Sequence, residues 1–367
     1  MKLALLTSSR ADYGIYLPLV KALTADPFFE LHIIAFGTHL STTYGETVNN
    51  IISDGFTVSA KVDTMPDGDS PEAITKAMGK TMINFSEVWS ANEYDMILAL
   101  GDRFEMFAAC ASSVPYGIPI AHIHGGETTL GAIDDIFRHS ITQMATFHFT
   151  VAEEYKQRVI ALKGSDKHVY NVGALSIDNL RFMKLLTIEQ FNEQYGIDLT
   201  RPSLLITFHP ETVDYHKSET YVDELLAALE EINGYQFIFM MPNADTTANM
   251  IRKKFTDFVA GNENAIGIES LGVLSYLSCM KHCTMMLGNT SSGFIEAGFF
   301  PKYVINIGDR QKGRILTDNM YNCPIQKDAI IKAVNAYAGK KMPKNIDLYG
   351  TGTTAQQIVS ILKKENN

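Results

Sequence analysis

The stretch "MILALGDRFEMFAACASSVPYGIPIAHIH" (residues 96–124) contains a strand–helix–strand pattern from end to end. Two short apolar runs, "MILALG" and "IPIAHIH", flank the segment Arg103–Val114, whose Ala- and Cys-rich composition is typical of a packed helix. Strands that are apolar at nearly every position are buried on both faces, and such strands are parallel and joined by crossover helices. The stretch therefore predicts a βαβ unit within a parallel sheet.

The same alternation runs along most of the chain. Further strand candidates are "LALLTS" (3–8), "LHIIAFG" (31–37), "FHFTVA" (147–152), "HVYNVG" (168–173), "SLLITFH" (203–209), "YQFIFMMP" (235–242), "AIGIES" (265–270), "TMMLGN" (284–289) and "YVINIG" (303–308). An interval rich in Asn, Gln and Glu near residues 190–200 separates two series of strands. We therefore expect an α/β protein of two Rossmann-like, doubly wound domains, with residues 1–173 in the first and 174–353 in the second.

Composition limits the function classes. The 367 residues are 46% hydrophobic and 20% charged, which is typical of a globular protein with two domains. A net charge of −10 without a Lys/Arg tract argues against nucleic acid or a membrane surface as a partner, but it leaves room for a phosphate-bearing small molecule. No apolar run approaches the roughly 20 residues of a membrane span. The four cysteines form no C-x-x-C pair, so we expect a cytoplasmic protein with reduced thiols.

Polar side chains follow several of the expected strands. Ligands of parallel α/β folds bind beyond the carboxyl ends of the strands, so we expect the active site in the cleft between the two domains. Arg10 and Asp12 follow the first strand in a loop before a helix. Ser9 or Asp12 would cap that helix, whereas a cation such as Arg10 is favourable at a helix N-terminus only beside a bound anion. Asp102 follows "MILALG", where it would be a helix cap or a general base.

Two histidines lie in "AHIHGGE" (121–127). His122 and His124 would point to the same side of an extended strand, as a zinc pair would. A zinc site needs a third ligand at fixed geometry, and no H-x-x-x-H or C-x-x-C spacing lies nearby. We therefore expect no metal, and either a polar catalytic strand end or plain packing. Asp134 opens the next helix, as a capping residue or as a catalytic carboxylate.

The second domain offers an expected anion site. His209 ends the strand "SLLITFH" before a proline. In "GNTSSGFIEAG" (288–298), small polar residues precede an expected helix that carries Glu296. Main-chain N–H groups and hydroxyls at a helix N-terminus would bind a diphosphate, and Glu296 would hold a ribose diol, although Ser and Thr also cap helices without any ligand.

Segments along nearly the whole chain resemble one family. In chain order they are "RADYG", "GDRFE", "HIHGGE" with "GAIDD" and "RHSITQ", "NVGALSID", "TFHPET", "GNTSSGFIEA" and "INIGDRQKGR". Together they resemble the hydrolysing UDP-N-acetylglucosamine 2-epimerases of sialic acid biosynthesis. The resemblance implies a glycosyltransferase-B-like fold, with the nucleotide in the cleft and a final helix, 354–367, that returns to the first domain. It also implies a homodimer or a dimer of dimers.

The resemblance further implies a reaction in which UDP-N-acetylglucosamine and water give N-acetylmannosamine and UDP. The C2 proton becomes removable as the C1–diphosphate bond breaks, so the enzyme must stabilise the leaving diphosphate and place a base at C2. Elimination gives a 2-acetamidoglucal, which water hydrates at C1 while C2 is reprotonated from the opposite face. The resemblance implies neither a cofactor nor a metal.

The resemblance assigns roles by position. It implies acid/base carboxylates at Asp102 and Asp134 and an essential histidine at His209. Relatives carry a glutamate where this chain has His124, so either His124 transfers a proton or Glu127 supplies the carboxylate. The residues implied to bind the substrate or UDP are Arg10, Asp12, Thr290, Ser291, Ser292, Gly293, Glu296 and Arg310.

Three alternatives stay open at this point. In the first, the substrate is a UDP- or GDP-linked 2,4-diacetamido-trideoxyhexose of a legionaminic-type pathway. In the second, the enzyme is a non-hydrolysing epimerase that returns UDP-N-acetylmannosamine, so that no UDP accumulates. In the third, the chain is a glycosyltransferase or a nucleotide-sugar-binding protein without this turnover.

Overall fold

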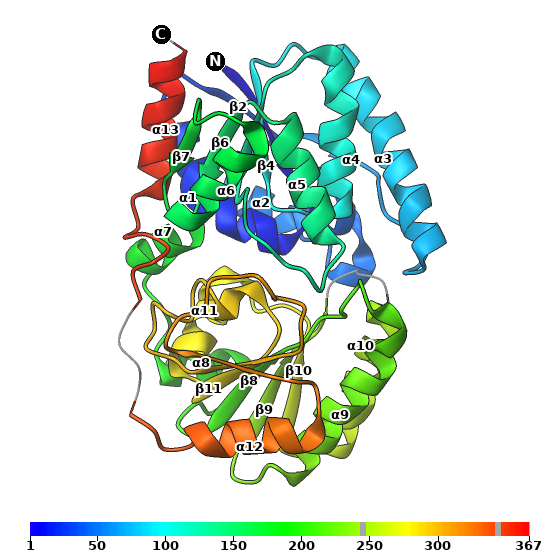
Figure 1. Cartoon of the computed structure of the whole chain (residues 1–367), viewed down its shortest axis with the longest axis vertical. Helices are drawn as coiled ribbons and strands as arrows, with labels where there is room; N and C mark the ends of the chain where they lie inside the picture. Colours follow the sequence, from blue (N-terminus) through cyan, green and yellow to red (C-terminus); the bar gives the residue numbers. More distant parts are fainter. Residues whose placement is uncertain (243–246, 342–345, 367) are drawn as a thin grey trace. The chain divides into compact units, whose positions relative to one another are not determined.

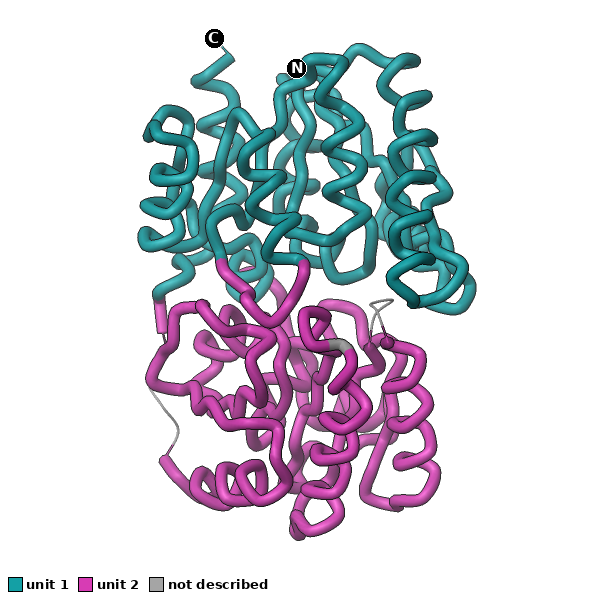
Figure 2. Tube along the Cα trace, turned by 45° about the vertical axis from the view of Figure 1, so that its right-hand side comes forward, with its two compact units in different colours: residues 1–127, 134–181, 348–367 teal, residues 128–133, 182–347 magenta. Residues whose placement is uncertain are grey.

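The structure, a computed structural model, describes residues 1–242, 247–341 and 346–366. The chain forms two compact units (Figures 1 and 2). Unit 1 consists of Met1–Glu127, Asp134–Arg181 and Leu348–Asn367, and unit 2 consists of Thr128–Ile133 and Phe182–Asp347. The main crossing between the units therefore lies after Arg181, and residues 128–133 leave unit 1 and return to it.

Unit 1 is built on a parallel sheet with the strand order β3-β2-β1-β4-β5-β6-β7. The strands are β1 (Lys2–Thr7), β2 (Glu30–Phe36), β3 (Val58–Val62), β4 (Met96–Leu100), β5 (Ile120–Ile123), β6 (Phe147–Thr150) and β7 (Val169–Asn171). Leu3 and Leu5 of β1 belong to one apolar cluster, and Ala4 and Leu6 to another. Because successive side chains of a strand point to opposite faces, the sheet is buried on both, which explains the continuous apolar runs.

Helices cover the two faces of this sheet. They are α1 (Arg10–Ala25), α2 (Val48–Ser53), α3 (Pro71–Ala91), α4 (Phe104–Ser113), α5 (Asp134–Met144), α6 (Glu153–Lys163), α7 (Leu175–Phe182) and α13 (Thr354–Glu365), with 3-10 turns η1 (Gly37–Leu40), η2 (Thr42–Tyr44) and η3 (Val114–Tyr116). Helix α13, red in Figure 1, packs with α1 against the cluster that contains Leu3. The carboxylate of Asp178 accepts from the main-chain N of Thr354 at 3.0 Å and of Ala355 at 2.8 Å. Buried Asp178 thus caps α13 and fastens the C-terminal helix to unit 1.

Unit 2 is a second parallel sheet, with the order β10-β9-β8-β11-β12-β13. Its strands are β8 (Ser203–Thr207), β9 (Gln236–Met240), β10 (Ala265–Ile268), β11 (Met285–Gly288), β12 (Val304–Ile307) and β13 (Met320–Cys323). Its helices are α8 (Ile188–Tyr195), α9 (Ser218–Glu231), α10 (Ala248–Gly261), α11 (Gly272–His282) and α12 (Lys327–Tyr337), with 3-10 turns η4 (Tyr215–Lys217) and η5 (Ser291–Gly293). None of the helices in the described ranges is long and apolar enough to cross a membrane.

The doubly wound α/β fold predicted from the sequence is confirmed in both units, and every predicted strand is present. Strands β3 and β13 were not predicted, because both lie at sheet edges and contain polar, partly exposed residues. In each sheet the strand order reverses beside the first strand, between β1 and β4 and between β8 and β11. Open α/β sheets bind ligands at such switch points, so the residues at these four strand ends are the first candidates for a site.

Candidate active site

A buried polar network follows β1. Helix α1 begins at Arg10, so the prediction that Arg10 and Asp12 lie in a loop before the helix is wrong. Ser9 is the N-cap, and Asp12 completes a capping box with it. Burial would raise the pKa of Asp12, but His39, 3.8 Å away, and the Thr7 hydroxyl, which donates at 2.5 Å, outweigh it and hold this pKa below its usual value. Asp12 thus shapes the turn that presents Arg10, and its contact with a substrate stays a prediction.

Both ring nitrogens of His122, in β5, form hydrogen bonds to other parts of unit 1. Its Nε2 donates to the carbonyl of Gly101 at 2.8 Å, and its Nδ1 accepts from the hydroxyl of Thr142 at 3.0 Å. A carbonyl oxygen only accepts, so this tautomer is the neutral one. Burial lowers the pKa of His122 to about 4, which keeps the ring uncharged near neutral pH. Both ring nitrogens are therefore occupied by structural hydrogen bonds.

His124, directly after β5, is held by Glu127. Its φ of +68° lies in the left-handed region, so the alternation by which His122 and His124 were expected to face one side no longer applies. The Nδ1 atom lies 2.7 Å from Oε1 of Glu127, and both side chains are buried. Nε2 is also buried, and no described residue offers it a hydrogen bond. The carboxylate therefore orients the ring and leaves Nε2 for proton transfer.

Arg138 of α5 joins Glu127 to Asp102. Its Nη2 donates to Oδ2 of Asp102, and its Nη1 lies 3.8 Å from Oε2 of Glu127. The N-cap of α4 is Arg103, so the alternative in which Asp102 caps this helix is excluded. Two carboxylates and one guanidinium are thus linked beside His124.

Asp134 is the first residue of α5 and is partly exposed. One turn further along this helix lies Arg138, and the i,i+4 pair of Asp135 and His139 is present at 3.6 Å. Unit 1 therefore brings Asp102, Glu127 and His124 together around Arg138. Asp134 lies on the same helix as that arginine.

In unit 2, Asn289 locks the end of β8 to the end of β11. Its Oδ1 accepts from the main-chain N of His209 and its Nδ2 donates to the His209 carbonyl, both at 2.8 Å. The carbonyl of Asn289 accepts from Nε2 of Gln311 at 2.9 Å and from Nη1 of Arg310 at 3.5 Å. Asn289 is fully buried. One residue thus fixes both the predicted histidine and the loop that carries the predicted arginine.

The segment after β11 differs from the prediction. An α-helix carrying Glu296 was expected, but only the 3-10 turn Ser291–Gly293 is present, followed by further turns. A Cβ at Gly293 would lie 2.9 Å from Cγ1 of Val304, so the segment passes too close to β12 for a regular helix with side chains on that side. The main-chain N–H groups of Ile295 and Glu296 donate to the carbonyls of Ser291 and Ser292, each at 3.1 Å, so the segment is helix-like without being a regular helix. The hydroxyls of residues 290–292 and the main chain of Gly293 stay the predicted diphosphate contacts.

Tyr276 of α11 lies against this segment. Burial raises the pKa of Tyr276, a hydrogen bond with Ser292 opposes the shift, the charge of Glu296 adds to it, and a hydrogen bond with Thr207 opposes it. The phenol is therefore protonated near neutral pH. Glu296 itself is buried, so the predicted ribose contact is a carboxylate next to a hydrogen-bonded hydroxyl cluster.

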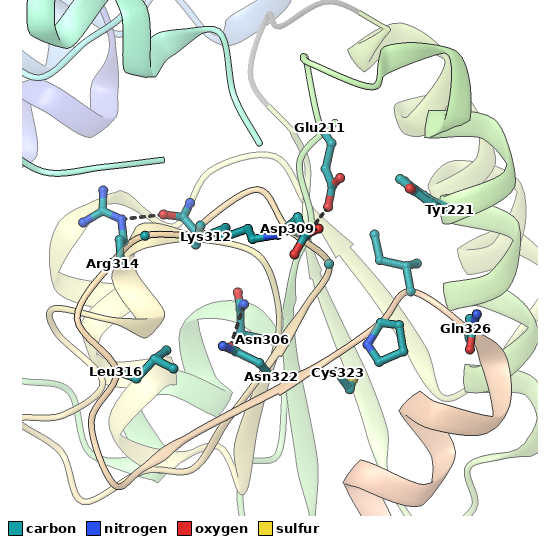
Figure 3. A pocket seen from close by; sticks show the side chains of 15 residues that line it. Glu211, Tyr221, Asn306, Asp309, Lys312, Arg314, Leu316, Asn322, Cys323 and Gln326 are labelled. Atoms are coloured by element: carbon teal, nitrogen blue, oxygen red, sulfur yellow. Dashed lines mark hydrogen bonds and ion pairs between the residues drawn. The ribbon is translucent and has the colours of Figure 1, made fainter. Parts of the chain in front are cut away.

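The loop Gly308–Arg314, which we call the arginine loop, presents Arg310. Oε1 of Glu211 accepts from the main-chain N of Asp309 at 2.6 Å and of Arg310 at 3.2 Å (Figure 3). Burial raises the pKa of Glu211, and the main-chain N–H of Asp309 opposes the shift. The Nε of Arg310 is buried without a hydrogen-bond partner in the described part of the chain. A guanidinium with such unused donors suits a phosphate oxygen.

A cavity of about 510 Å³ lies beside the arginine loop, and Figure 3 shows the side chains that line it. Glu211, Tyr221 and the amides of Asn306 and Asn322 line it, and Asn306 donates to Asn322 at 2.9 Å. The cavity lies where residues 308–319 join β12 to β13 without a crossover helix, so the sheet face is less covered there. Its wall shares Glu211 with the clamp on the arginine loop.

Several residues of these clusters were not identified from the sequence. They are Arg138, Glu211, Tyr276 and Asn289. Asn289 follows β11 directly, so the rule that singled out other strand ends applies to it as well. Arg138 and Tyr276 lie within helices, where sequence spacing gives no sign of their partners. Within the described ranges, no group of three or more His, Cys, Asp or Glu is placed to hold a metal ion.

The chain is similar to known proteins along almost its whole length. The family described as UDP-N-acetylglucosamine 2-epimerase matches residues 21–363. The "Polysialic acid biosynthesis protein P7" of Escherichia coli is 36% identical over 93% of this chain and 87% of its own length. The "UDP-N,N'-diacetylbacillosamine 2-epimerase (hydrolyzing)" of Legionella pneumophila is 32% identical over 99% of this chain and 95% of its own.

A solved structure supports the fold class. The UDP-GlcNAc 2-epimerase of Methanocaldococcus jannaschii, in complex with UDP-GlcNAc and UDP, matches with a TM-score of 0.84 and 19% identity, over 99% of this chain and 100% of that one. At this identity the likeness concerns the fold, and it confirms the expected glycosyltransferase-B-like class of two parallel α/β domains. With the family match over most of the sequence and the relatives above 30% identity, the chain belongs to the UDP-N-acetylglucosamine 2-epimerase family.

Proposed function

We propose that the chain is a hydrolysing 2-epimerase that converts UDP-N-acetylglucosamine and water into N-acetylmannosamine and UDP. The observation that carries the proposal is the buried pair of Glu127 and His124, in which Nδ1 is held at 2.7 Å and Nε2 has no partner among the described residues. A histidine fixed at one nitrogen by a carboxylate is the usual arrangement of a general base.

In the proposed first step, a base takes the C2 proton of the sugar. The C2–H electron pair forms the C1=C2 double bond, and the C1–O electron pair leaves with the diphosphate of UDP. His124 accepts this proton, or returns it in the second step, through Nε2. The net negative charge of Asp102, Glu127 and Arg138 stabilises the imidazolium formed when His124 is protonated.

Unit 2 supplies the nucleotide contacts in this proposal. The guanidinium of Arg310 has a buried Nε available to a phosphate, and the hydroxyls of residues 290–292 lie in the turn after β11. Glu296 takes the ribose hydroxyls. The structure from Methanocaldococcus jannaschii, which is in complex with UDP-GlcNAc and UDP, supports a nucleotide sugar as ligand.

In the second step, water adds to C1 of the 2-acetamidoglucal while a proton is delivered to C2 from the opposite face. One proton of the water passes to a base, so the atoms balance to free N-acetylmannosamine. The relative from Legionella is described as hydrolyzing, which supports release of the free sugar over return of a UDP-sugar. Free UDP then accumulates.

A second substrate is favoured by one observation. The relative from Legionella pneumophila is described as acting on UDP-N,N'-diacetylbacillosamine, a 2,4-diacetamido sugar. The relative from Escherichia coli, at higher identity, is described by polysialic acid biosynthesis, which supports N-acetylglucosamine as the sugar. We therefore place UDP-N-acetylglucosamine first and the 2,4-diacetamido-trideoxyhexose second.

The test is a product assay by NMR in deuterated water. The protein is incubated in turn with UDP-N-acetylglucosamine and with UDP-N,N'-diacetylbacillosamine. We expect UDP and N-acetylmannosamine with deuterium at C2 from the first. Turnover of the second sugar alone would move the assignment to that substrate, and UDP-N-acetylmannosamine without UDP would show a non-hydrolysing enzyme. Sedimentation of the same sample tests the homodimer or dimer of dimers that we propose.

A further inference from the structure

One short segment leaves unit 1 and returns to it. Thr128–Ile133, which we call the strap, belongs to unit 2, while the residues on both sides belong to unit 1 (Figure 2). The residue before the strap is Glu127, and the residue after it is Asp134. The strap therefore begins after the carboxylate that holds His124 in the proposed function and ends before Asp134, which the family resemblance implies as an acid/base carboxylate.

The strap lies against the main chain of the arginine loop. The N–H of Leu130 donates to the carbonyl of Lys312 at 3.0 Å. A Cβ at Gly131 would lie 2.4 Å from the carbonyl oxygen of Asp309 and 2.5 Å from Cα of Arg310. Real side chains do not fit at such distances from backbone atoms, so only glycine permits this approach. The strap thus lies against the main chain of Arg310, whose Nε has no hydrogen-bond partner among the described residues.

The other side of the strap is fixed to the segment that follows His209. The N–H of Ile133 donates to the hydroxyl of Thr212 at 2.9 Å, and the N–H of Val213 donates to the carbonyl of Gly131 at 3.4 Å. Glu211 of the same segment clamps the arginine loop at residues 309 and 310. The strap, the arginine loop and the segment after β8 therefore form one hydrogen-bonded layer in unit 2.

We propose that the strap is a positioning element that makes the placement of Glu127 and Asp134 depend on an anion bound at Arg310. The proposal rests on the proposed function. A nucleoside diphosphate held by Arg310 immobilises the arginine loop, and the main-chain contacts of Gly131 and Leu130 pass this order to the strap. Glu127, which orients His124, and Asp134 are then set for reaction only when the leaving group is in place.

The test compares Gly131→Ala with Gly79→Ala. Neither glycine has a positive φ, so alanine strains neither backbone, but a Cβ at Gly79 in α3 meets nothing within 4 Å. Amide hydrogen exchange is measured with and without saturating UDP, together with UDP affinity, kcat and KM. In the wild type we expect UDP to slow exchange at Leu130 and Ile133.

In Gly131→Ala we expect UDP to bind within about threefold of the wild-type affinity, because the added Cβ forces the strap away from the arginine loop while the Arg310 guanidinium is kept. We expect the protection of the strap to be lost and kcat to fall about tenfold or more, since small misplacements of catalytic groups are costly. KM changes little. Gly79→Ala should match the wild type in exchange, affinity and kcat. A merely structural role of Gly131 would lower thermal stability without separating kcat from UDP binding.

The outcomes separate the two proposals. If the wild type does not bind UDP, the proposed function fails. If it binds UDP and the strap amides exchange as before, or if Gly131→Ala keeps wild-type kcat, the strap proposal is overturned. Should Gly131→Ala not fold, Thr212→Val decides, because it removes only the hydroxyl that accepts from Ile133. It should reduce strap protection and lower kcat about threefold, and an unchanged Thr212→Val overturns the proposal.

Discussion

Replacing Glu127 with glutamine tests whether this carboxylate acts on His124. The substitution keeps the size of the side chain and an oxygen that can accept from Nδ1, but it removes the negative charge. The distance of 2.7 Å between Nδ1 and Oε1 lies in the range of charge-assisted hydrogen bonds. Such a bond stabilises by about 1.5–3 kcal/mol, against about 0.5–1.5 kcal/mol for a neutral one. The imidazolium that forms when Nε2 takes up a proton in the reaction therefore loses about 1–1.5 kcal/mol of stabilisation, which corresponds to about a tenfold loss of rate.

The assay is the rate of UDP release from UDP-N-acetylglucosamine, measured as kcat/KM from about pH 5 to pH 9. We expect kcat/KM of Glu127→Gln to fall about tenfold over this range, because the carboxylate no longer stabilises the imidazolium formed in the reaction and the ring is less firmly oriented.

The chain offers a matched control in Glu30→Gln. Glu30 pairs with Nε2 of His32 at 3.0 Å, so this change also removes a carboxylate from a Glu–His pair in unit 1. Its side chain is largely exposed and lies outside the candidate site, so its profile should match the wild type. A Glu127→Gln enzyme with full activity would refute the reasoning.

Three further changes have definite expectations. Asn289→Ala removes two hydrogen bonds to the main chain of His209, each worth about 1 kcal/mol, and should lower kcat/KM about tenfold or more. An unchanged kcat/KM would show that Asn289 does not hold His209 for catalysis. The pKa of His122, lowered to about 4 by burial, is below its unfolded value, so its stabilisation is complete above about pH 6.5 and is lost as the pH falls toward 4. The free energy of unfolding in urea, followed by the fluorescence of Trp89 in unit 1, should fall by about 3 kcal/mol over that pH range, and by less in His122→Asn. The same pH dependence in both proteins would contradict a buried neutral ring. Asp178→Ala removes the cap of α13 and should cost about 1–2 kcal/mol, seen as faster proteolysis of the C-terminal helix, and an unchanged rate would contradict the capping role.

The sequence predicts the two sheets well because burial on both faces leaves a signal in every strand. "MILALG" and "IPIAHIH" contain almost only apolar residues, and β4 and β5 are fully buried. "VSAKV" of β3 has no such signal, because one face of this edge strand is exposed. The helix expected after β11 is absent for a reason that sequence does not reveal, since the contact of Gly293 with Val304 is tertiary.

From the residue pattern, the sequence predicts members of the candidate site only where a polar side chain directly follows a strand. Asp102, His124 and His209 follow strands and were identified from that position alone. Arg138 lies in the middle of α5, and its two carboxylate partners come from other parts of the chain. A positive φ at His124 is also invisible in a sequence, because few residues other than glycine adopt it.

The structure bears on the question of whether His124 or Glu127 replaces the glutamate of relatives. Glu127 is 1% exposed, with Oε1 on His124 and Oε2 facing Arg138, so it cannot approach a sugar without breaking these contacts. We infer that Glu127 is a positioning residue and that His124 is the group that meets C2. Proton removal and return on opposite faces require a second group. Asp102 has a side chain that is 20% exposed, and Asp134 is partly exposed, so we propose one of these carboxylates as the group on the other face.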